Sequence, residues 1–121
     1  MVTVEDVDFI TIPTRDIDRA RRFYGETLGL RLDRETHAGV EFLAGRTTLG
    51  IWAPEPMGDS FAPTPNPVAL RVADVAAARG ELEAAGVQFS GDTIDTGVCH
   101  MAIFADPDGN ALMLHRRYAP R

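Results

Sequence analysis

The sequence predicts an α+β fold built from two βαβββ modules. Two amphipathic helical stripes, each surrounded by short extended runs, support this class. An internal repeat supports the two modules. The helix-capping residues Asp16 and Asp74 lie 58 residues apart (74 minus 16), and the same offset aligns Ile12 with Leu70. Because each half is too small to bury its sheet alone, we expect the two modules to pack together.

Module 1 covers about residues 5–53. β-branched residues alternate along Val7–Thr14, which predicts a strand. Asp16 is a good N-cap, and apolar residues that recur every three or four positions predict a helix ending at Gly29; they are Ile17, Ala20, Tyr24 and Leu28. Three further strands are expected over residues 30–36, 40–44 and 47–53.

A proline-rich segment over residues 54–67 joins the modules. It contains five of the eight prolines, which disfavour a helix and remove backbone donors. We interpret this segment as a linker or a lid, stiffened by its prolines.

Module 2 covers about residues 68–118 and repeats the order of elements. A strand over 68–72 precedes the N-cap Asp74, and a second apolar stripe predicts a helix that ends at Gly86. Strands are expected over 87–90, 98–104 and 111–117. Between the last two, the run from Asp106 to Asn110 predicts a tight hairpin turn.

Length and composition indicate a single globular domain over residues 1–121, with 45% hydrophobic and 25% charged residues. No apolar run approaches the ~20 residues that span a bilayer, and the N-terminus does not resemble a signal peptide. Cys99 is the only cysteine, which excludes an internal disulfide and a Cys-cluster zinc site. We therefore expect a protein of the reducing cytoplasm with no membrane partner.

The charge balance argues against one class of partner. There are 18 acidic and 12 basic residues, and the formal net charge is −6. Such a surface repels phosphate backbones, so a nucleic-acid partner is not expected. It would attract a cationic ligand weakly, unless it serves only solubility.

Two motifs resemble those of a known superfamily. Asp16-Ile17-Asp18, Phe23-Tyr24 and Leu28-Gly29-Leu30 are similar to the opening motif of the vicinal oxygen chelate superfamily, and the run from Phe104 to Asn110 resembles its closing turn. The superfamily includes glyoxalase I, extradiol dioxygenases and bleomycin-resistance proteins. The resemblance implies that the paired modules form a curved, cup-like mixed sheet with the helices on the outside. It does not settle the activity, because one scaffold carries many different sites.

The resemblance also implies where a metal would bind. Enzymes of this superfamily hold a divalent metal with His, Glu, His and Glu, and the matching positions here are Phe9, Gly50, Pro67 and Met113. None of these residues offers the oxygen or nitrogen donor that a hard divalent metal requires. We therefore expect an apolar wall in place of a metal site, with no metal and no cofactor.

Apolar side chains are the main candidates for ligand contacts. Phe9, Trp52 and Met113 would line the cup, and alternation places Trp52 on the same strand face as Gly50. Core packing is the other reading of Trp52. Trp52 and Phe61 would both stack on a flat ligand, and Phe61 would belong to a lid.

The polar candidates are the histidines and one carboxylate. Alternation places His115 on the same face as Met113, either as a polar contact in the pocket or as an ordinary strand histidine. Glu41 is expected to face solvent at a sheet edge; on the cup side it would meet a cationic ligand or act as a base. Cys99 is expected to be an apolar filler and not a nucleophile.

The leading hypothesis is a metal-free small-molecule binding protein of the bleomycin-resistance type. It would sequester an apolar or aromatic ligand and so provide antibiotic resistance. The net charge of the chain would favour a cationic ligand. The resemblance also implies a homodimer, in which the proline-rich segment would allow modules to be exchanged.

Two alternatives remain open. The protein could be a lyase, isomerase or dioxygenase in which His115, His100 and Glu41 converge on an atypical metal site. It could also be an interaction module whose cup is filled by its own apolar side chains.

Overall fold

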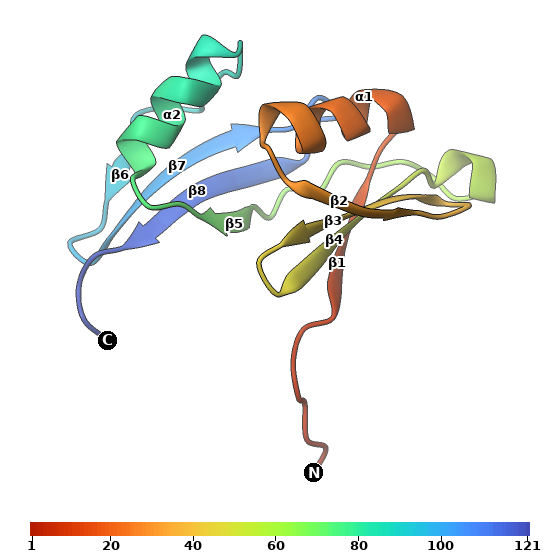
Figure 1. Ribbon diagram of the computed structural model, residues 1–121, viewed down its shortest axis with the longest axis horizontal. Coiled ribbons are helices and arrows are strands. Elements are labelled where there is room, and N and C mark those ends of the chain that lie inside the picture. Colours follow the sequence, from red (N-terminus) through yellow and green to blue (C-terminus); the bar gives the residue numbers. More distant parts are fainter. The chain divides into compact units, whose positions relative to one another are not determined.

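The computed structural model describes residues 1–121, which form two compact units over residues 1–62 and 63–121. Each unit contains one four-stranded mixed sheet, and the elements of each follow the order βαβββ (Figure 1). The predicted α+β class and the two βαβββ modules are confirmed. The pairing of the modules into one cup stays a prediction.

In unit 1 the sheet has the strand order β1-β4-β3-β2. β1 runs parallel to β4, and the other neighbours are antiparallel. The elements are β1 (Phe9–Pro13), α1 (Ile17–Arg22), η1 (Phe23–Thr27), β2 (Arg31–Glu35), β3 (Gly39–Ala44), β4 (Thr47–Trp52) and η2 (Glu55–Met57).

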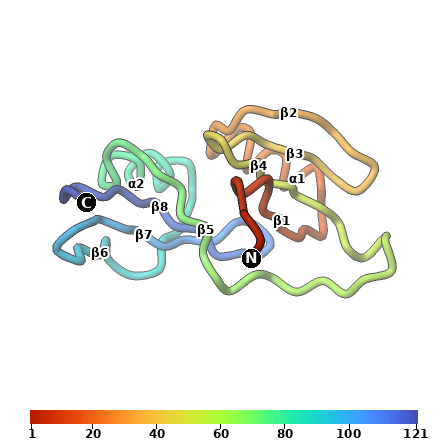
Figure 2. Tube along the Cα trace, turned by 90° about the horizontal axis from the view of Figure 1, so that it is seen from below, coloured from red at the N-terminus to blue at the C-terminus, as the bar shows by residue number.

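Unit 2 has the same topology, with the order β5-β8-β7-β6 and β5 parallel to β8 (Figure 2). Its elements are β5 (Val68–Arg71), α2 (Val75–Ala84), β6 (Ile94–Asp95), β7 (Cys99–Ala105) and β8 (Ala111–Arg117). The internal repeat extends to the strand register. Ile12 pairs with Ile51 in unit 1, and Leu70 pairs with Leu114 in unit 2. The alignment of Ile12 with Leu70 is thus confirmed.

Both helices begin at the predicted caps. The side chain of Asp16 accepts a hydrogen bond from the amide of Arg19, and that of Asp74 from the amide of Ala77, each at 3.0 Å. These bonds satisfy amides that have no partner within the helix. The predicted end at Gly86 is also confirmed, because its φ of 93° is accessible without strain only to glycine.

The first helix is not α-helical along its full predicted length. α1 ends at Arg22, and η1 is a π-helical turn in which the amide of Leu28 donates to the carbonyl of Phe23 at 2.9 Å. The wider turn lets the consecutive residues Phe23 and Tyr24 both enter the core, with their rings edge to face at 5.3 Å. The regular spacing of apolar residues in the sequence predicts a continuous α-helix and does not indicate this π-helical turn.

The strand expected over residues 87–90 was a wrong prediction. Only a single bridge joins Phe89 to Phe104, and the edge strand is instead β6. Phe89 packs against Phe104 at 5.0 Å between ring centroids, and the amide of Ser90 donates to Ile103. The chain then turns away at Gly91, whose φ is 73°. Apolar residues in this segment therefore serve packing and not strand pairing.

The proline-rich segment is partly ordered by local contacts. The expectation that this segment contains no helix was wrong at one 3-10 turn, η2. Pro54 and Pro56 are tolerated there because they lie at the start of the turn, where the backbone amides have no partner within the helix. Further on, the amide of Thr64 donates to Oδ1 of Asn110 at 2.9 Å within unit 2. The units divide this segment after Ala62, and its role as a lid stays a prediction.

The hairpin turn between β7 and β8 is built around two buried polar side chains. Oδ1 of Asp106 accepts the amides of Asp108 and Asn110, each at 2.9 Å. Oδ2 of Asp106 accepts the side-chain amide of Asn110 at 2.8 Å. Asn110 is fully buried and Gly109 has a φ of 88°, so the predicted turn is confirmed.

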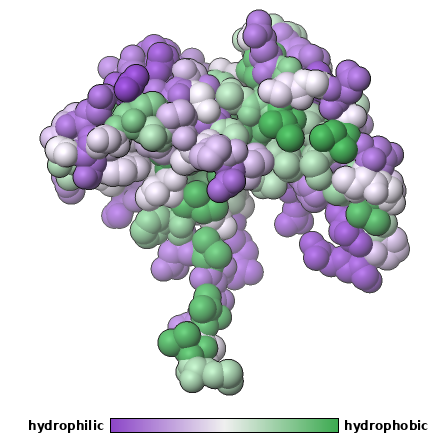
Figure 3. Space-filling model, turned by 180° about the vertical axis from the view of Figure 1, so that it is seen from behind, coloured by the Kyte–Doolittle hydropathy of each residue, from purple (hydrophilic) through white to green (hydrophobic).

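The N-terminal residues form an exposed arm. Met1, Val2, Val4 and Val7 are all largely accessible, and Figure 3 shows hydrophobic side chains along the arm. The ion pair between Arg46 and Asp6, at 2.8 Å, ties the base of the arm to unit 1. Neither helix combines the length and apolarity that crossing a bilayer requires.

Candidate functional site

In each unit one sheet face is covered by a helix and the other is open. In unit 1 the buried residues Val40, Phe42, Leu49 and Ile51 lie on the face that α1 covers. Strand alternation places Glu41, Gly50 and Trp52 on the opposite face, which we call the open face of unit 1. The expectation that Trp52 and Gly50 share a face is confirmed.

The open face of unit 1 presents aromatic side chains. Phe9 lies there on β1 and is 61% exposed, whereas Trp52 on β4 is partly buried. A Cβ at Gly50 would meet only the carbonyl of Ile10, at 3.8 Å, so the surface beside these rings is not filled. Flat organic molecules pack well against such rings.

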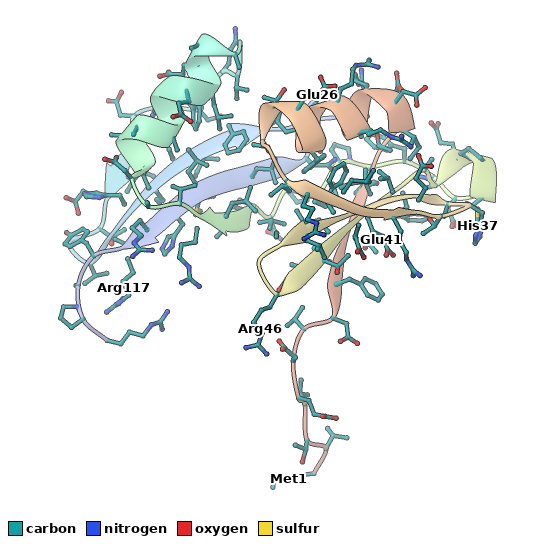
Figure 4. The ribbon with its side chains drawn as sticks, in the orientation of Figure 1. Met1, Glu26, His37, Glu41, Arg46 and Arg117 are labelled. Carbon is teal, nitrogen blue, oxygen red and sulfur yellow. The ribbon has the colours of Figure 1, made fainter.

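Glu41 does not lie at a sheet edge, so this prediction was wrong. β3 is an interior strand, and Glu41 lies on its open face opposite Gly50 (Figure 4). Its Oε1 accepts a hydrogen bond from Nε of Arg34 at 2.8 Å, and this bond raises the pKa of Arg34. The carboxylate already has a cationic partner, and a cationic ligand would have to compete with Arg34 for it.

Phe61 is held by a neighbouring cation. The guanidinium of Arg15 lies over its ring, 4.5 Å from the centroid, and Nε of Arg15 lies 3.6 Å from Oε1 of Glu55. These contacts fix the ring beside the start of α1.

In unit 2 the open face is partly apolar and partly basic. Leu112 and Leu114 are buried under α2, so alternation places Met113, His115 and Arg117 on the other face of β8. The predicted shared face of Met113 and His115 is confirmed. Ile103 and Met101, the register partners of Met113 and His115 on β7, lie on this face too.

A cavity of about 560 Å³ lies at the basic end of this face. Its lining includes Ala69, Arg71, His115, Arg116, Arg117 and Arg121. Arg71 is the register partner of His115 on the parallel strand β5. Figure 4 shows Arg117 on the side of the sheet away from α2.

Sequence reasoning missed the arginines of this cavity. The run His115-Arg116-Arg117 was the available signal, because alternation along residues 111–117 places Arg117 on the face of His115. Arg71 could be added only through the pairing of β5 with β8.

The two histidines of unit 2 do not converge. Met101 is the register partner of His115, so His100, next to Met101 on β7, lies on the other face of the sheet. Nε2 of His100 lies 3.3 Å from Oδ2 of Asp95, and its ring stacks on Tyr118 at 4.8 Å. The alternative in which His100 and His115 converge on one metal site therefore does not hold within unit 2. Neither unit contains a group of three or more His, Cys, Asp or Glu residues placed to hold a metal.

A polar cluster surrounds Asp95 at the edge of unit 2. Its Oδ1 accepts the amide of Gly97 at 2.9 Å and the hydroxyl of Tyr118 at 2.8 Å, and these bonds lower the pKa of Asp95. The same carboxylate raises the pKa of Tyr118, because ionising the phenol would break the bond. The cluster joins the end of the chain after β8 to β6.

A second cavity, of about 370 Å³, lies in unit 1. It is lined by α1, the hairpin between β2 and β3, and η2. Arg21 and Glu35 form an ion pair at its edge, and His37 also lines it. None of the residues expected to bind a ligand lies in this cavity.

Cys99 is buried, as expected, and its Sγ lies 3.1 Å from Oγ1 of Thr96.

None of the curated proteins matches this chain. Among solved structures it is similar to TnmS3, an antibiotic binding protein from Streptomyces sp. CB03234, with 27% identity, a TM-score of 0.77, and coverage of 97% of this chain and 99% of that one.

Two further structures share the fold. One is a member of the glyoxalase/bleomycin resistance protein/dioxygenase superfamily from Sphaerobacter thermophilus DSM 20745, with 24% identity, a TM-score of 0.79, and coverage of 93% and 97%. The other is lactoylglutathione lyase from Agrobacterium tumefaciens, with 18% identity, a TM-score of 0.79, and coverage of 93% and 94%. The family profile matches residues 6–114, nearly the whole chain. The chain therefore belongs to the Glyoxalase/Bleomycin resistance protein/Dioxygenase superfamily.

Proposed function

We propose that this protein binds a small organic molecule through apolar and aromatic contacts on its open sheet faces, and that no metal ion is needed to hold it. One observation carries the proposal. The four positions that the resemblance matches to metal ligands of the superfamily's enzymes hold Phe9, Gly50, Pro67 and Met113, whose side chains offer no oxygen or nitrogen donor.

The placement of these residues supports an organic ligand. Phe9 and Met113 lie on open faces and not in a core, so their side chains are available to a bound molecule, and Gly50 leaves space beside Phe9 on the same face. Burying the exposed part of a phenylalanine contributes roughly 1–2 kcal/mol, so three such contacts supply roughly 3–6 kcal/mol, which corresponds to an affinity between millimolar and tens of micromolar. TnmS3 is an antibiotic binding protein, and the likeness to it favours an antibiotic as the ligand. Sequestering that antibiotic would give antibiotic resistance.

A neutral aromatic probe tests this proposal. N-phenyl-1-naphthylamine carries no charge and fluoresces when it leaves water. We expect saturable binding that chelator does not weaken, together with a change in the emission of Trp52, the only tryptophan. Protein purified without chelator is expected to contain far less than one metal ion per chain.

Two matched variants locate the contact. Phe9→Ala removes an exposed ring from the open face of unit 1 and is expected to weaken probe binding about tenfold. Leu32→Ala is the control, because Leu32 is the register partner of Phe42 and lies on the other face of the same sheet. Stoichiometric zinc, manganese, nickel or iron that is lost in His115→Ala would overturn the proposal, and so would equal effects of the two variants.

We also propose that two copies of the chain associate and exchange modules through the proline-rich segment. Light scattering of the protein as it elutes from a size-exclusion column checks the association, since a dimer has twice the 13.2 kDa mass of one chain. A single species at the mass of one chain, at all concentrations tested, would contradict it.

A further inference from the structure

The arginines of the two units have different partners. The chain contains no lysine, so its 12 basic residues are all arginines. In unit 1, four of the seven arginines pair with a carboxylate: Arg15, Arg21, Arg34 and Arg46. In unit 2 only Arg79 does so, with Glu83. The other four arginines of unit 2 line the 560 Å³ cavity and form no ion pair.

No Asp or Glu side chain lines the cavity to offset these charges. Arg71, Arg117 and His115 come from two neighbouring strands and share the open face. Nη2 of Arg117 donates to the carbonyl of Pro120 at 3.1 Å, which fixes the guanidinium, while its Nε is buried and has no hydrogen-bond partner. Like charges gathered without an acidic side chain among them repel one another, and a bound anion relieves this repulsion.

The surface beside the cavity is apolar. Met113 lies two residues before His115 on the same face of β8, and Ile103 is its register partner on β7. A molecule that places a charged group among the arginines can therefore rest its apolar body against these side chains.

We propose that this cavity binds the anionic group of an aromatic or apolar acid, with Arg71 and Arg117 as its anchors and Met113 and Ile103 under its apolar part. The inference rests on the proposed function and specifies its ligand as an organic anion. This replaces the cationic ligand that the net charge of −6 suggested. Charges beyond about 8–10 Å are screened at physiological salt, so the arginines that touch the ligand decide its sign.

A pair of probes that differ only in charge tests the inference. 1-Anilinonaphthalene-8-sulfonate is N-phenyl-1-naphthylamine with one added sulfonate. We expect the sulfonate probe to bind about tenfold more tightly than the neutral probe. Added salt should weaken the sulfonate probe much more than the neutral one.

Substitutions locate the anion. Arg71→Gln, at an exposed position, is expected to weaken the sulfonate probe about tenfold and to leave the neutral probe within about twofold. Arg71→Lys keeps the charge and should retain part of the affinity. Arg46→Gln, which removes the same charge from unit 1, is the control and is expected to change neither probe. Arg117→Gln should behave like Arg71→Gln, with neutral-probe binding as evidence that the variant is folded.

The possible results separate this inference from the proposed function. If both probes bind equally well, or if Arg71→Gln and Arg46→Gln have the same effect on the sulfonate probe, the anion site is wrong and the proposed function stands. If neither probe binds, both proposals fall. Preference for the sulfonate probe that is lost only in the Arg71 and Arg117 variants supports the site.

Discussion

Arg71 and His115 are register partners on the parallel strands β5 and β8, and both side chains belong to the face that α2 leaves uncovered. This pairing brings together residues that are 44 positions apart in the sequence (115 minus 71). It gives the open face of unit 2 a basic end beside the apolar Met113. In the anion site proposed above, the sign of the ligand's charge follows from this pairing and not from the charge of the whole chain.

A carboxylate introduced into the cavity should compete with an anionic ligand. Ala69 lines the cavity two residues before Arg71 on the same strand face, and its small side chain makes few contacts. Ala69→Glu is expected to weaken binding of the sulfonate probe at least tenfold, because the new carboxylate occupies the arginines. Fluorescence titration measures the effect. Ala76→Glu, on the exposed side of α2, adds the same charge and should leave the affinity within about twofold. Equal losses in the two variants would point to a general charge effect.

Gly39 permits β3 to pair with β4 beside Trp52. A Cβ at residue 39 would overlap the carbonyl oxygen of Ile51, which belongs to the neighbouring strand and cannot move freely. We expect Gly39→Ala to lower the free energy of unfolding by about 1–3 kcal/mol, as measured by urea denaturation. Gly80→Ala is a matched control of opposite sign. Nothing lies within 4 Å of a Cβ there, and alanine in the interior of α2 should stabilise the helix by about 0.5–1 kcal/mol. A Gly39→Ala protein as stable as the parent would show that β4 yields to the methyl group.

Asn110 holds the hairpin turn together from a buried position. Its side chain donates to Asp106 and accepts from the amide of Thr64, and no part of it is exposed. Asn110→Ala leaves a buried carboxylate oxygen and a backbone amide without these partners. We expect a loss of about 2–4 kcal/mol in the free energy of unfolding by urea denaturation. Asp92→Ala, in an exposed loop of the same unit, should change it by less than about 0.5 kcal/mol. A loss below about 1 kcal/mol in Asn110→Ala would mean that water replaces both bonds.

Titration of Tyr118 should depend on Asp95. The phenol donates to the carboxylate, so the folded pKa of Tyr118 lies above the ordinary value of 10.0. The amide of Gly97 and, after it, this phenol hold the pKa of Asp95 below 3.8. A raised phenol pKa means that the bond contributes fully to the free energy of unfolding below pH 10. This contribution is lost as the pH rises through the folded pKa of Tyr118. A lowered carboxyl pKa means that the carboxylate of Asp95 contributes to the free energy of unfolding above about pH 4. This contribution is lost as the pH falls through the folded pKa of Asp95.

The variant Asp95→Asn separates the two effects. Phenolate absorbance should show Tyr118 ionising at a lower pH than in the parent protein, because the charged acceptor is gone. Asp92→Asn removes a carboxylate from the same loop region and is expected to leave that titration unchanged. An identical tyrosine titration in Asp95→Asn and the parent would show that the bond does not persist in solution.

Local signals in the sequence predicted much of the fold. The caps at Asp16 and Asp74, the turn around Asp106 and the alternation along β8 each depend on residues within a few positions of one another. Residues 87–90 show where such signals fail. Phe89 alternates as in a strand, but its ring packs against Phe104 and only one bridge forms, a choice that depends on the neighbouring strand.

The candidate site could be predicted only in part, because local signals place some of its residues and the strand order and register place the others. Alternation placed Trp52 with Gly50 and Met113 with His115, but Glu41 was misplaced because the strand order of a sheet is not a local property. His100 was misplaced as well, since its face is fixed by the register between β7 and β8.

The sequence by itself determined the two βαβββ modules, their helix caps and the loss of donors at Phe9, Gly50, Pro67 and Met113, because these depend on residue identity and short spacing. Only the tertiary structure decided which arginines have no acidic partner. Strand pairing between distant segments, as between Arg71 and His115, determines which charged side chains lie close to an opposite charge. The net charge of −6 carries no information about that geometry.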